Sequence, residues 1–197
     1  MKKLIRPIIL VHGLWDNPSV FQPLLLNLRQ YKPLVYAPHL PHLYGRSSIY
    51  SLAIDLERKI SRRFAPNVDI DILGFSMGGL VSRIWIQELS GFRRTKRFFC
   101  VGSPQKGTIT SQIVPKYLMP GIADMKIGSD LITSLKKNSY LLKKIECKSF
   151  YCLYDLMVFP GWQAVLPVGR RYKVPVFTHK SLISHPKGVQ YLTKAIV

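Results

Sequence analysis

Short apolar runs alternate with segments of helical spacing along almost the whole of this chain. The apolar runs predict buried strands, and they fall at residues 7–11, 34–37, 68–75, 98–101, 150–154 and 174–177. Between them, apolar residues recur at helical spacing, which predicts helices at 20–30, 48–64, 77–89 and 129–137 and after residue 186. Alternating strands and helices favour a parallel sheet, because each crossover helix returns the chain to the same edge. The pattern therefore predicts the α/β class, with a single doubly wound, mostly parallel sheet that has helices on both faces.

The composition favours one continuous folding unit. The chain has 197 residues, 47% of them hydrophobic, and contains no internal repeat, low-complexity tract or linker. This length suits one full core, so residues 1–197 are interpreted as a single domain. No apolar run reaches the roughly 18 residues of a membrane-spanning helix. Arg6 and Pro7 interrupt the apolar N-terminal stretch, which we interpret as a strand rather than a targeting segment.

One apolar run, residues 70–75, ends in a Gly-x-Ser-x-Gly motif and opens at once into a helical segment. This is the layout of a nucleophile elbow, in which Ser76 sits on a sharp strand-to-helix turn with a strained backbone. Gly74 and Gly78 lack a Cβ atom, so the strand and the helix can approach closely enough to close the turn. The motif therefore predicts a serine nucleophile.

A serine nucleophile needs a base to take its proton and an acid to orient the base. In doubly wound hydrolases these partners follow in the order serine, acid, histidine, on loops at the carboxyl ends of strands. Among the acids after Ser76, Asp155 alone directly follows a predicted strand, although Asp124 in an irregular segment stays open. His179 stands just past the last predicted strand, whereas His185 falls at the start of the final helix. The order predicts Asp155 as the acid and His179 as the base.

The negative charge of a tetrahedral intermediate needs backbone N–H donors. We expect one from Met77, directly after the serine, and the second from Leu14, in the loop after the first strand. His12 in the same loop is interpreted as ordering that loop without transferring protons. Segment 106–128 is rich in proline, glycine and apolar residues, and is predicted either to cover part of the site or to pack on the sheet edge. Apolar residues near the serine would suit an acyl chain; the expected ones are Trp15, Phe159 and Trp162.

Together, Val11-His12-Gly13, the Gly74–Gly79 motif, Asp155 and His179 resemble the α/β-hydrolase superfamily, in particular the small bacterial lipases and esterases that lack a lid domain. The likeness spans nearly the whole chain. It implies a triad of Ser76, Asp155 and His179, with Leu14 and Met77 forming the oxyanion hole. Two features depart from these relatives: Thr178 replaces the glycine often found before the catalytic histidine, and segment 106–128 is longer.

The formal net charge is +19, from 29 basic and 10 acidic residues. Because the amino ends of parallel strands share one edge, basic residues on connections leading into them would form a basic surface opposite the site. That surface predicts peripheral contact with an anionic membrane. The alternative is that these residues are solvated cations at helix C-termini, where the helix dipole favours positive charge. No aromatic interleaving of the kind that stacks bases is evident, so no nucleic acid is expected. The clusters are Lys2-Lys3, Arg58-Lys59, Arg62-Arg63, Arg93-Arg94, Lys96-Arg97, Lys143-Lys144 with Lys148, and Arg170-Arg171 with Lys173.

These features predict hydrolysis of a carboxylic ester through an acyl-enzyme, with an acyl or lipid ester as the favoured substrate. An acyltransferase or thioesterase would use the same triad, a non-catalytic relative would use only the basic face for binding, and a peptidase is a weaker alternative. Scattered histidines and cysteines show no ligand spacing, so no metal and no organic cofactor is expected. The three cysteines, Cys100, Cys147 and Cys152, predict buried, reduced thiols in a cytoplasmic protein. The predicted contact with membranes is peripheral and rests on the basic clusters.

Overall fold

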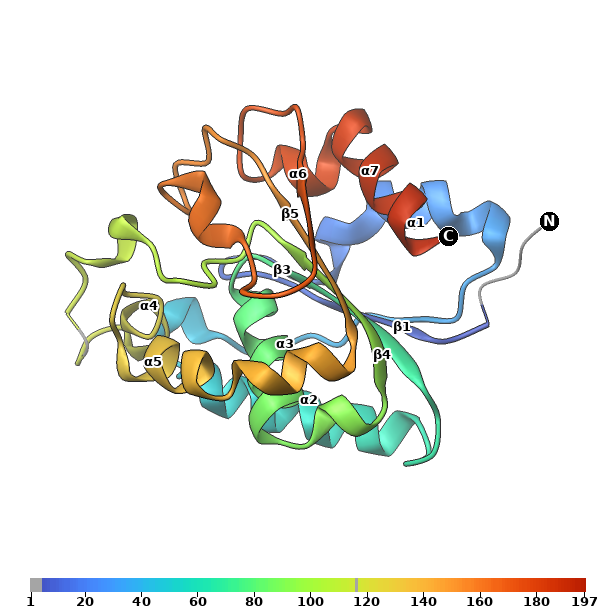
Figure 1. The fold of residues 1–197 in the computed structure, drawn as a ribbon, viewed down its shortest axis with the longest axis horizontal. Coiled ribbons are helices and arrows are strands. Elements are labelled where there is room, and N and C mark those ends of the chain that lie inside the picture. The colour runs from blue at the N-terminus through green and yellow to red at the C-terminus, as the bar shows by residue number, and fades with distance from the viewer. Residues whose placement is uncertain (1–4, 116) are drawn as a thin grey trace.

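A computed structural model describes residues 5–115 and 117–197. Within them the chain forms a six-stranded sheet of order β2-β1-β3-β4-β5-β6, and every strand pairs in parallel (Figure 1). The strands are β1 (Ile8–Val11), β2 (Val35–Tyr36), β3 (Ile70–Phe75), β4 (Thr95–Val101), β5 (Glu146–Tyr151) and β6 (Arg170–Lys173). The strand order reverses between β1 and β3, where ligands bind in open sheets of this type. The predicted α/β class and the parallel, doubly wound sheet are confirmed.

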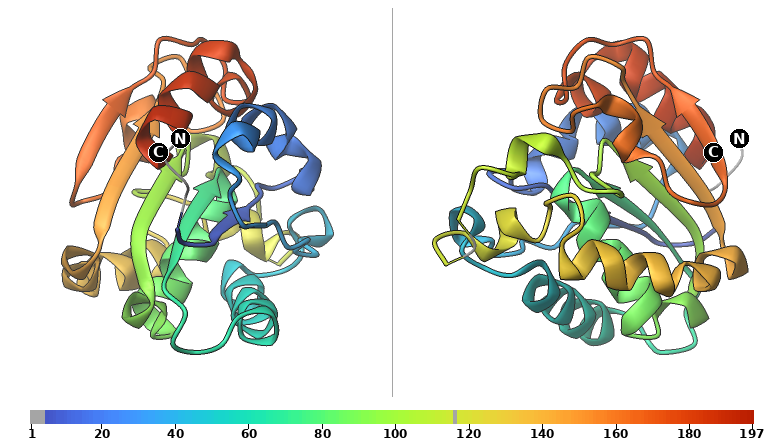
Figure 2. Two further views of the ribbon diagram at one scale, coloured as in Figure 1. Left: turned by 90° about the vertical axis from the view of Figure 1, so that its right-hand side faces the viewer. Right: turned by 60° about the vertical axis from the view of Figure 1, so that its left-hand side comes forward.

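Helices cover both faces of the sheet (Figures 1 and 2). The helices α2, α3 and α5 lie on one face, and α1, α6 and α7 lie on the other. Their bounds are α1 (Gln22–Leu28), α2 (Ile49–Arg63), α3 (Met77–Glu88), α4 (Pro120–Ala123), α5 (Asp130–Lys137), α6 (Ser181–Ser184) and α7 (Pro186–Ile196). The connecting 3₁₀ turns are η1 (Pro18–Phe21), η2 (Arg29–Tyr31), η3 (Leu43–Gly45), η4 (Gly91–Arg93), η5 (Ile109–Ser111), η6 (Ser139–Lys144) and η7 (Gly161–Ala164).

Two hydrophobic cores result, one on each face of the sheet. In β1, Ile9 and Val11 enter the core beneath α2 and α3, whereas Ile8 and Leu10 enter the core beneath α1 and α7. Successive side chains of a strand point to opposite faces, so a strand covered on both sides must be apolar throughout. This double burial explains the unbroken apolar runs of the central strands.

The last two strands correct the sequence prediction. The strand predicted at 150–154 is β5, which begins and ends earlier, and the one predicted at 174–177 is instead β6 at Arg170–Lys173. Because β6 is an edge strand and largely exposed, its sequence is polar. Apolar runs therefore do not reveal it. Val174 and Val176 are buried in the core beyond the end of that strand. Asp155 and His179 therefore follow their strands after several residues of loop.

The basic clusters are divided between helix ends and three strands. Those at the ends of α2, η4 and η6 lead into the amino ends of β3, β4 and β5. Lys96 and Arg97 lie within β4 and Lys148 lies within β5, which corrects their predicted place on connections. The cluster of Arg170, Arg171 and Lys173 lies within edge strand β6, which corrects its predicted place on a connection, and Lys2-Lys3 lie outside the described residues. Contact between these clusters and an anionic membrane stays a prediction. No helix in the described ranges combines the length and apolarity that crossing a membrane requires.

Candidate active site

Ser76 occupies the sharp turn between β3 and α3. Its backbone has φ 53° and ψ −130°, a conformation that a residue with a side chain rarely adopts. The turn is held by a hydrogen bond from the Ser76 N–H to the Val101 carbonyl, at 2.9 Å. The Ser76 side chain is partly exposed at the carboxyl edge of the sheet, as the elbow motif predicts.

The two glycines of the motif are sterically required. A Cβ atom on Gly78 would lie 2.2 Å from the Val11 carbonyl oxygen, and one on Gly74 would lie 2.5 Å from the Gly79 Cα. Both obstacles are backbone atoms, which cannot move aside as a flexible side chain can. Any larger residue at either position would therefore force β1, β3 and α3 apart and displace Ser76.

Asp155 and His179 form a buried acid–imidazole pair. The Asp155 Oδ2 lies 2.7 Å from the His179 Nδ1, while its Oδ1 accepts the N–H groups of Met157 and Val158, each at 2.9 Å. Because the carboxylate accepts in all three contacts, the shared proton belongs on Nδ1 of the histidine. The other ring nitrogen, Nε2, then carries a lone pair, which is the form that a general base needs.

His179 lines the same pocket as Ser76. Its Nε2 atom is buried and has no hydrogen-bond partner within the described residues, and the ring stacks on Phe75 with centroids 4.9 Å apart. The pocket has a volume of about 150 Å³ and is lined by both Ser76 and His179. No hydrogen bond joins their side chains in residues 5–115 and 117–197, and such bonds are often completed only when substrate is bound.

The two expected oxyanion donors also lie beside Ser76. Leu14 lines the pocket, and Met77 is the first residue of α3, where N–H groups have no partner within the helix. A Cβ atom on Gly13 would lie 2.7 Å from the Ser76 Cβ, so the loop after β1 packs directly against the serine. The role of the Leu14 and Met77 N–H groups as oxyanion donors stays a prediction.

Both ring nitrogens of His12 interact with backbone groups. Its Nε2 accepts the Leu40 N–H at 3.0 Å, which places the proton on Nδ1, and Nδ1 contacts the Gly13 carbonyl, also at 3.0 Å. Burial lowers the pKa of His12, an effect that the Gly13 carbonyl opposes and the nearby rings of His39 and His42 reinforce. Both nitrogens therefore serve the backbone, as the sequence interpretation expected.

The expected apolar lining needs one correction. Trp15 lines the pocket, but Phe159 and Trp162 are not among the described residues that line it. Met157 and Val158 take their place, because the two N–H bonds to Asp155 turn this part of the loop inward. The backbone of Phe159 is bound to Thr108 and Ile109, so the loop continues along the outside.

Segment 106–128 supplies another wall of the pocket, through Thr108, Thr110, Ser111, Val114, Ile122 and Met125. The sequence marks Val114 and Ile122 as apolar residues of this segment, whereas the other four were not singled out. The only sequence signal for those four was their position in a segment rich in proline, glycine and apolar residues. Its role as a cover stays a prediction.

The alternative residues take other positions. The Asp124 Oδ2 accepts the N–H of Ile49, the first residue of α2, at 2.9 Å. His185 precedes α7 and accepts the Lys187 N–H, as a helix cap does. Neither side chain is among those that line the Ser76 pocket in the described residues.

Asp16 is an acid at the pocket that sequence reasoning missed. It lies two residues after Leu14 and lines the pocket together with Ser76 and His179. Burial raises the pKa of Asp16, an effect that the nearby Lys180 ammonium and the imidazoles of His179 and His42 oppose. The only sequence signal was its position in the loop that supplies the oxyanion donor.

The described residues contain no group of three or more histidine, cysteine, aspartate or glutamate side chains placed to hold a metal ion. Cys100, Cys147 and Cys152 are free and buried. Burial raises the pKa of Cys100 and Cys147 to about 12 and that of Cys152 to about 11, so all three stay thiols near neutral pH. This geometry can support acyl transfer through serine without any other nucleophile.

Comparison with known proteins agrees with the fold. A family model described as "Alpha/beta hydrolase family" matches residues 8–172. No curated protein matches by sequence. Among solved structures, lipase B of Aspergillus fumigatus superposes with a TM-score of 0.79 at 16% identity, over 97% of this chain and 52% of that one.

Two further solved structures match over most of both chains. The mature lipase BlEst2 of Bacillus licheniformis has a TM-score of 0.74 at 12% identity, over 98% of this chain and 92% of its own. A thermophilic esterase of Thermogutta terrifontis has a TM-score of 0.66 at 14% identity, over 99% and 89% respectively. The chain thus spans about half the length of the Aspergillus lipase and nearly all of the other two. At these identities the likeness concerns the fold.

Proposed function

The chain belongs to the alpha/beta hydrolase family, and from that premise we propose that it is a serine hydrolase that cleaves carboxylic esters through an acyl-enzyme. One observation carries the proposal. The buried pair of Asp155 and His179 leaves Nε2 of the histidine without a partner among the described residues, and His179 and Ser76 line the same pocket. A purely structural histidine would have both nitrogens satisfied, as His12 has.

In the proposed mechanism, the Ser76 Oγ attacks the ester carbonyl while the His179 Nε2 takes the hydroxyl proton. Asp155 holds the proton on Nδ1 and stabilises the imidazolium that forms. The N–H groups of Leu14 and Met77 bind the oxyanion. The imidazolium then gives its proton to the leaving alcohol, and the carbonyl is restored as the Ser76 ester. Water, deprotonated by the same nitrogen, releases the acid and regenerates the serine.

We propose an acyl or lipid ester as the substrate. The pocket walls include Val114, Ile122, Met125 and Val158, which suit an apolar acyl group. Large apolar side chains of the same loops also stay exposed: Trp15, Ile109, Ile113, Leu118, Leu156, Met157, Phe159 and Trp162. Exposed apolar residues around a pocket are typical of sites that bind apolar groups. Its position at the loops of the site supports a substrate with an extended apolar part.

The test is a pre-steady-state assay with p-nitrophenyl esters of graded chain length. We expect a burst of one p-nitrophenol per protein, followed by turnover, with both lost in Ser76→Ala. The matched control is Ser61→Ala, an exposed serine of α2 whose Oγ binds only Glu57, and it should keep both phases. The proposal would be overturned if the protein gave no burst and was not labelled by a serine-directed phosphonate.

The same assay distinguishes hydrolysis from acyl transfer. Added alcohol acceptors compete with water for the acyl-enzyme, so an acyltransferase would form more new ester than acid at low acceptor concentration. We expect acid as the main product. The optimum in chain length would then measure the apolar pocket.

A further inference from the structure

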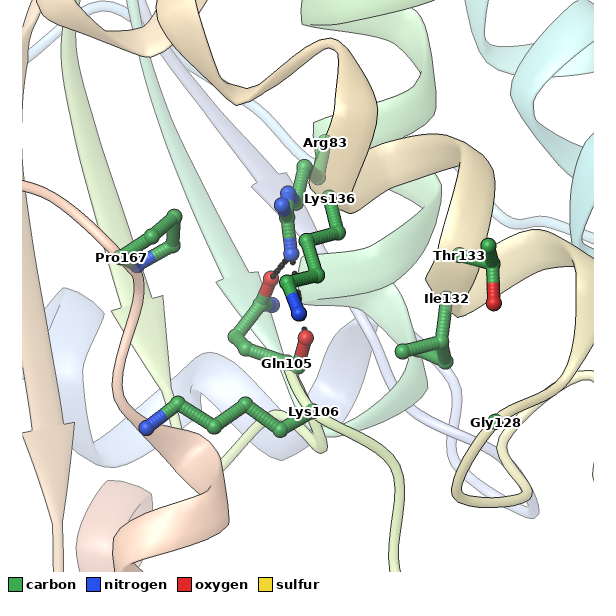
Figure 3. Close-up of a pocket in the computed structure, with 8 residues that line it drawn as sticks. All are labelled: Arg83, Gln105, Lys106, Gly128, Ile132, Thr133, Lys136 and Pro167. Carbon is green, nitrogen blue, oxygen red and sulfur yellow. Dashed lines mark hydrogen bonds between the residues drawn. The ribbon is translucent and has the colours of Figure 1, made fainter.

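A second pocket, of about 390 Å³, lies beside α3 on the side facing α5. Within the described residues it shares no lining residue with the Ser76 pocket: Pro104 lines one and Gln105 the other. Figure 3 shows its walls, which come from α3, from the turn after Pro104, from α5 and from Pro167. They are Arg83, Gln105, Lys106, Gly128, Ile132, Thr133, Lys136 and Pro167.

One residue that lines this pocket is a buried arginine, Arg83, which is only 2% exposed. Its four hydrogen bonds all go to neutral acceptors: the Gln87 side chain at 2.6 Å, the Gln105 side chain and carbonyl at 3.1 Å each, and the Leu135 carbonyl at 2.8 Å. Since a guanidinium has five N–H groups, at least one has no acceptor within the described residues.

Among the residues that the structure describes, no carboxylate forms an ion pair with this buried charge. Burial lowers the pKa of Arg83 to about 10, an effect that Glu88 on the same helix opposes from a distance, and the Glu88 Oε1 is bound to the Ser134 hydroxyl. Taking a cation out of water without a hydrogen-bonded anion carries a penalty of several kcal/mol. A buried arginine held by amides and carbonyls is therefore short of a negative partner.

Two more cations border the same pocket. Lys106 and Lys136 are exposed, and neither forms an ion pair in residues 5–115 and 117–197. In the view of Figure 3, Lys136 reaches down from α5 toward Gln105, and Lys106 extends across to the side of Pro167. The lining found in the described ranges includes no acidic side chain, so three positive charges surround one cavity.

We propose that this pocket binds a small organic phosphate. The two ammonium groups and the guanidinium provide charge-assisted hydrogen bonds of the kind that phosphate oxygens accept, and the Thr133 hydroxyl adds a neutral one. Ile132 and Pro167 form apolar walls that suit the organic part of the ligand. The volume falls in the range of small-molecule sites and exceeds what a single phosphate ion would fill.

The experiment is isothermal titration calorimetry of the full chain with glycerol 3-phosphate, and with glycerol as the uncharged reference. We expect saturable binding of one glycerol 3-phosphate and none of glycerol. The double variant Lys106→Ala/Lys136→Ala removes two exposed side chains and should weaken binding roughly tenfold or more. The matched control Lys137→Ala/Lys187→Ala removes the same charge from exposed positions outside the pocket and should bind as the parent does.

A second arm identifies the source of the phosphate. Vesicles containing phosphatidic acid present the same head group in a membrane, and their binding is compared between the two double variants. A loss specific to the pocket variant with vesicles indicates a lipid head group, and a loss only with dissolved glycerol 3-phosphate indicates a free metabolite. Absence of saturable binding in both arms, or equal binding by both variants, overturns the proposal. Because the readout is binding, a failed ester assay would leave this result unaffected.

Discussion

Two buried aspartates, Asp71 and Asp155, have the same exposure of 1% and opposite surroundings. Asp71 lies in β3 toward the amino edge of the sheet, and its carboxylate accepts one bond from Arg6 at 3.2 Å and two from Arg97 at 3.0 and 2.7 Å. Asp155 lies in the loop beyond β5 at the carboxyl edge, and accepts two backbone N–H groups and the His179 imidazole.

The difference lies in what each carboxylate leaves available. The hydrogen bonds of Asp71 join it to two permanent cations, so the group is neutralised and ties strands together. Asp155 binds a neutral ring whose second nitrogen remains free in a pocket. The two histidines repeat the contrast, since His12 uses both nitrogens and His179 only one. A buried polar group that is completely satisfied supports structure, whereas one left open at a cavity can do chemistry.

The largest expected effect concerns Asp155, whose histidine partner keeps one nitrogen without a hydrogen bond in the described part of the chain. Asp155→Asn should lower kcat for p-nitrophenyl esters by roughly 10³ to 10⁴-fold, because an amide N–H facing Nδ1 shifts the ring proton onto Nε2. Circular dichroism should show a folded protein, since the backbone N–H bonds to Oδ1 can be kept by the amide oxygen. Measured at equal folded concentration, unchanged turnover in this variant would mean that the pair is structural, like Asp71.

The next effect concerns Asp71, whose carboxylate is paired with two arginines. Asp71→Asn should lower the free energy of unfolding by about 3 kcal/mol, because the largely buried Arg97 loses its anion, and kcat per folded molecule should not change. Urea unfolding measures the first quantity and the ester assay the second. The matched control is Asp69→Asn, whose carboxylate is 47% exposed and pairs with Lys96 at the surface, and whose loss should cost less than about 1 kcal/mol. Equal costs for the two variants would contradict the contrast.

The smallest effect uses the satisfied histidine. Burial lowers the pKa of His12 in the folded chain below the value of 6.5 that it has when unfolded. The unfolded chain therefore binds an extra proton below pH 6.5. As the pH is lowered from 6.5 to the folded pKa, the free energy of unfolding decreases by up to about 1.4 kcal/mol per pH unit.

Thermal unfolding between pH 7 and pH 5 checks this slope. In His12→Gln the amide oxygen can accept the Leu40 N–H without titrating, so the slope should become shallower than in the parent. His185→Asn, which alters an exposed cap, should keep the parental slope. If both variants retained the same slope, protonation of His12 would not be the cause.

Much of the fold follows from local patterns. The nucleophile elbow depends on residues adjacent in the chain, so the glycine spacing and the strand-to-helix change place Ser76 without any long-range information. Chain order and strand ends then single out Asp155 and His179, which the structure brings to 2.7 Å. The sequence also places the start of α2 to within one residue, since Ser47 and Ser48 are both suitable caps, and the Ser48 Oγ accepts the Ser51 N–H.

Contacts between distant segments were decided only by the tertiary structure. The edge strand β6 escaped detection because a strand with one neighbour and an exposed face needs no apolar run. The pairing of Asp71 with Arg97 and the buried setting of Arg83 join residues that are far apart in the chain. Periodicity reveals which face of an element is buried, but the register and packing of the whole sheet determine which side chains meet there.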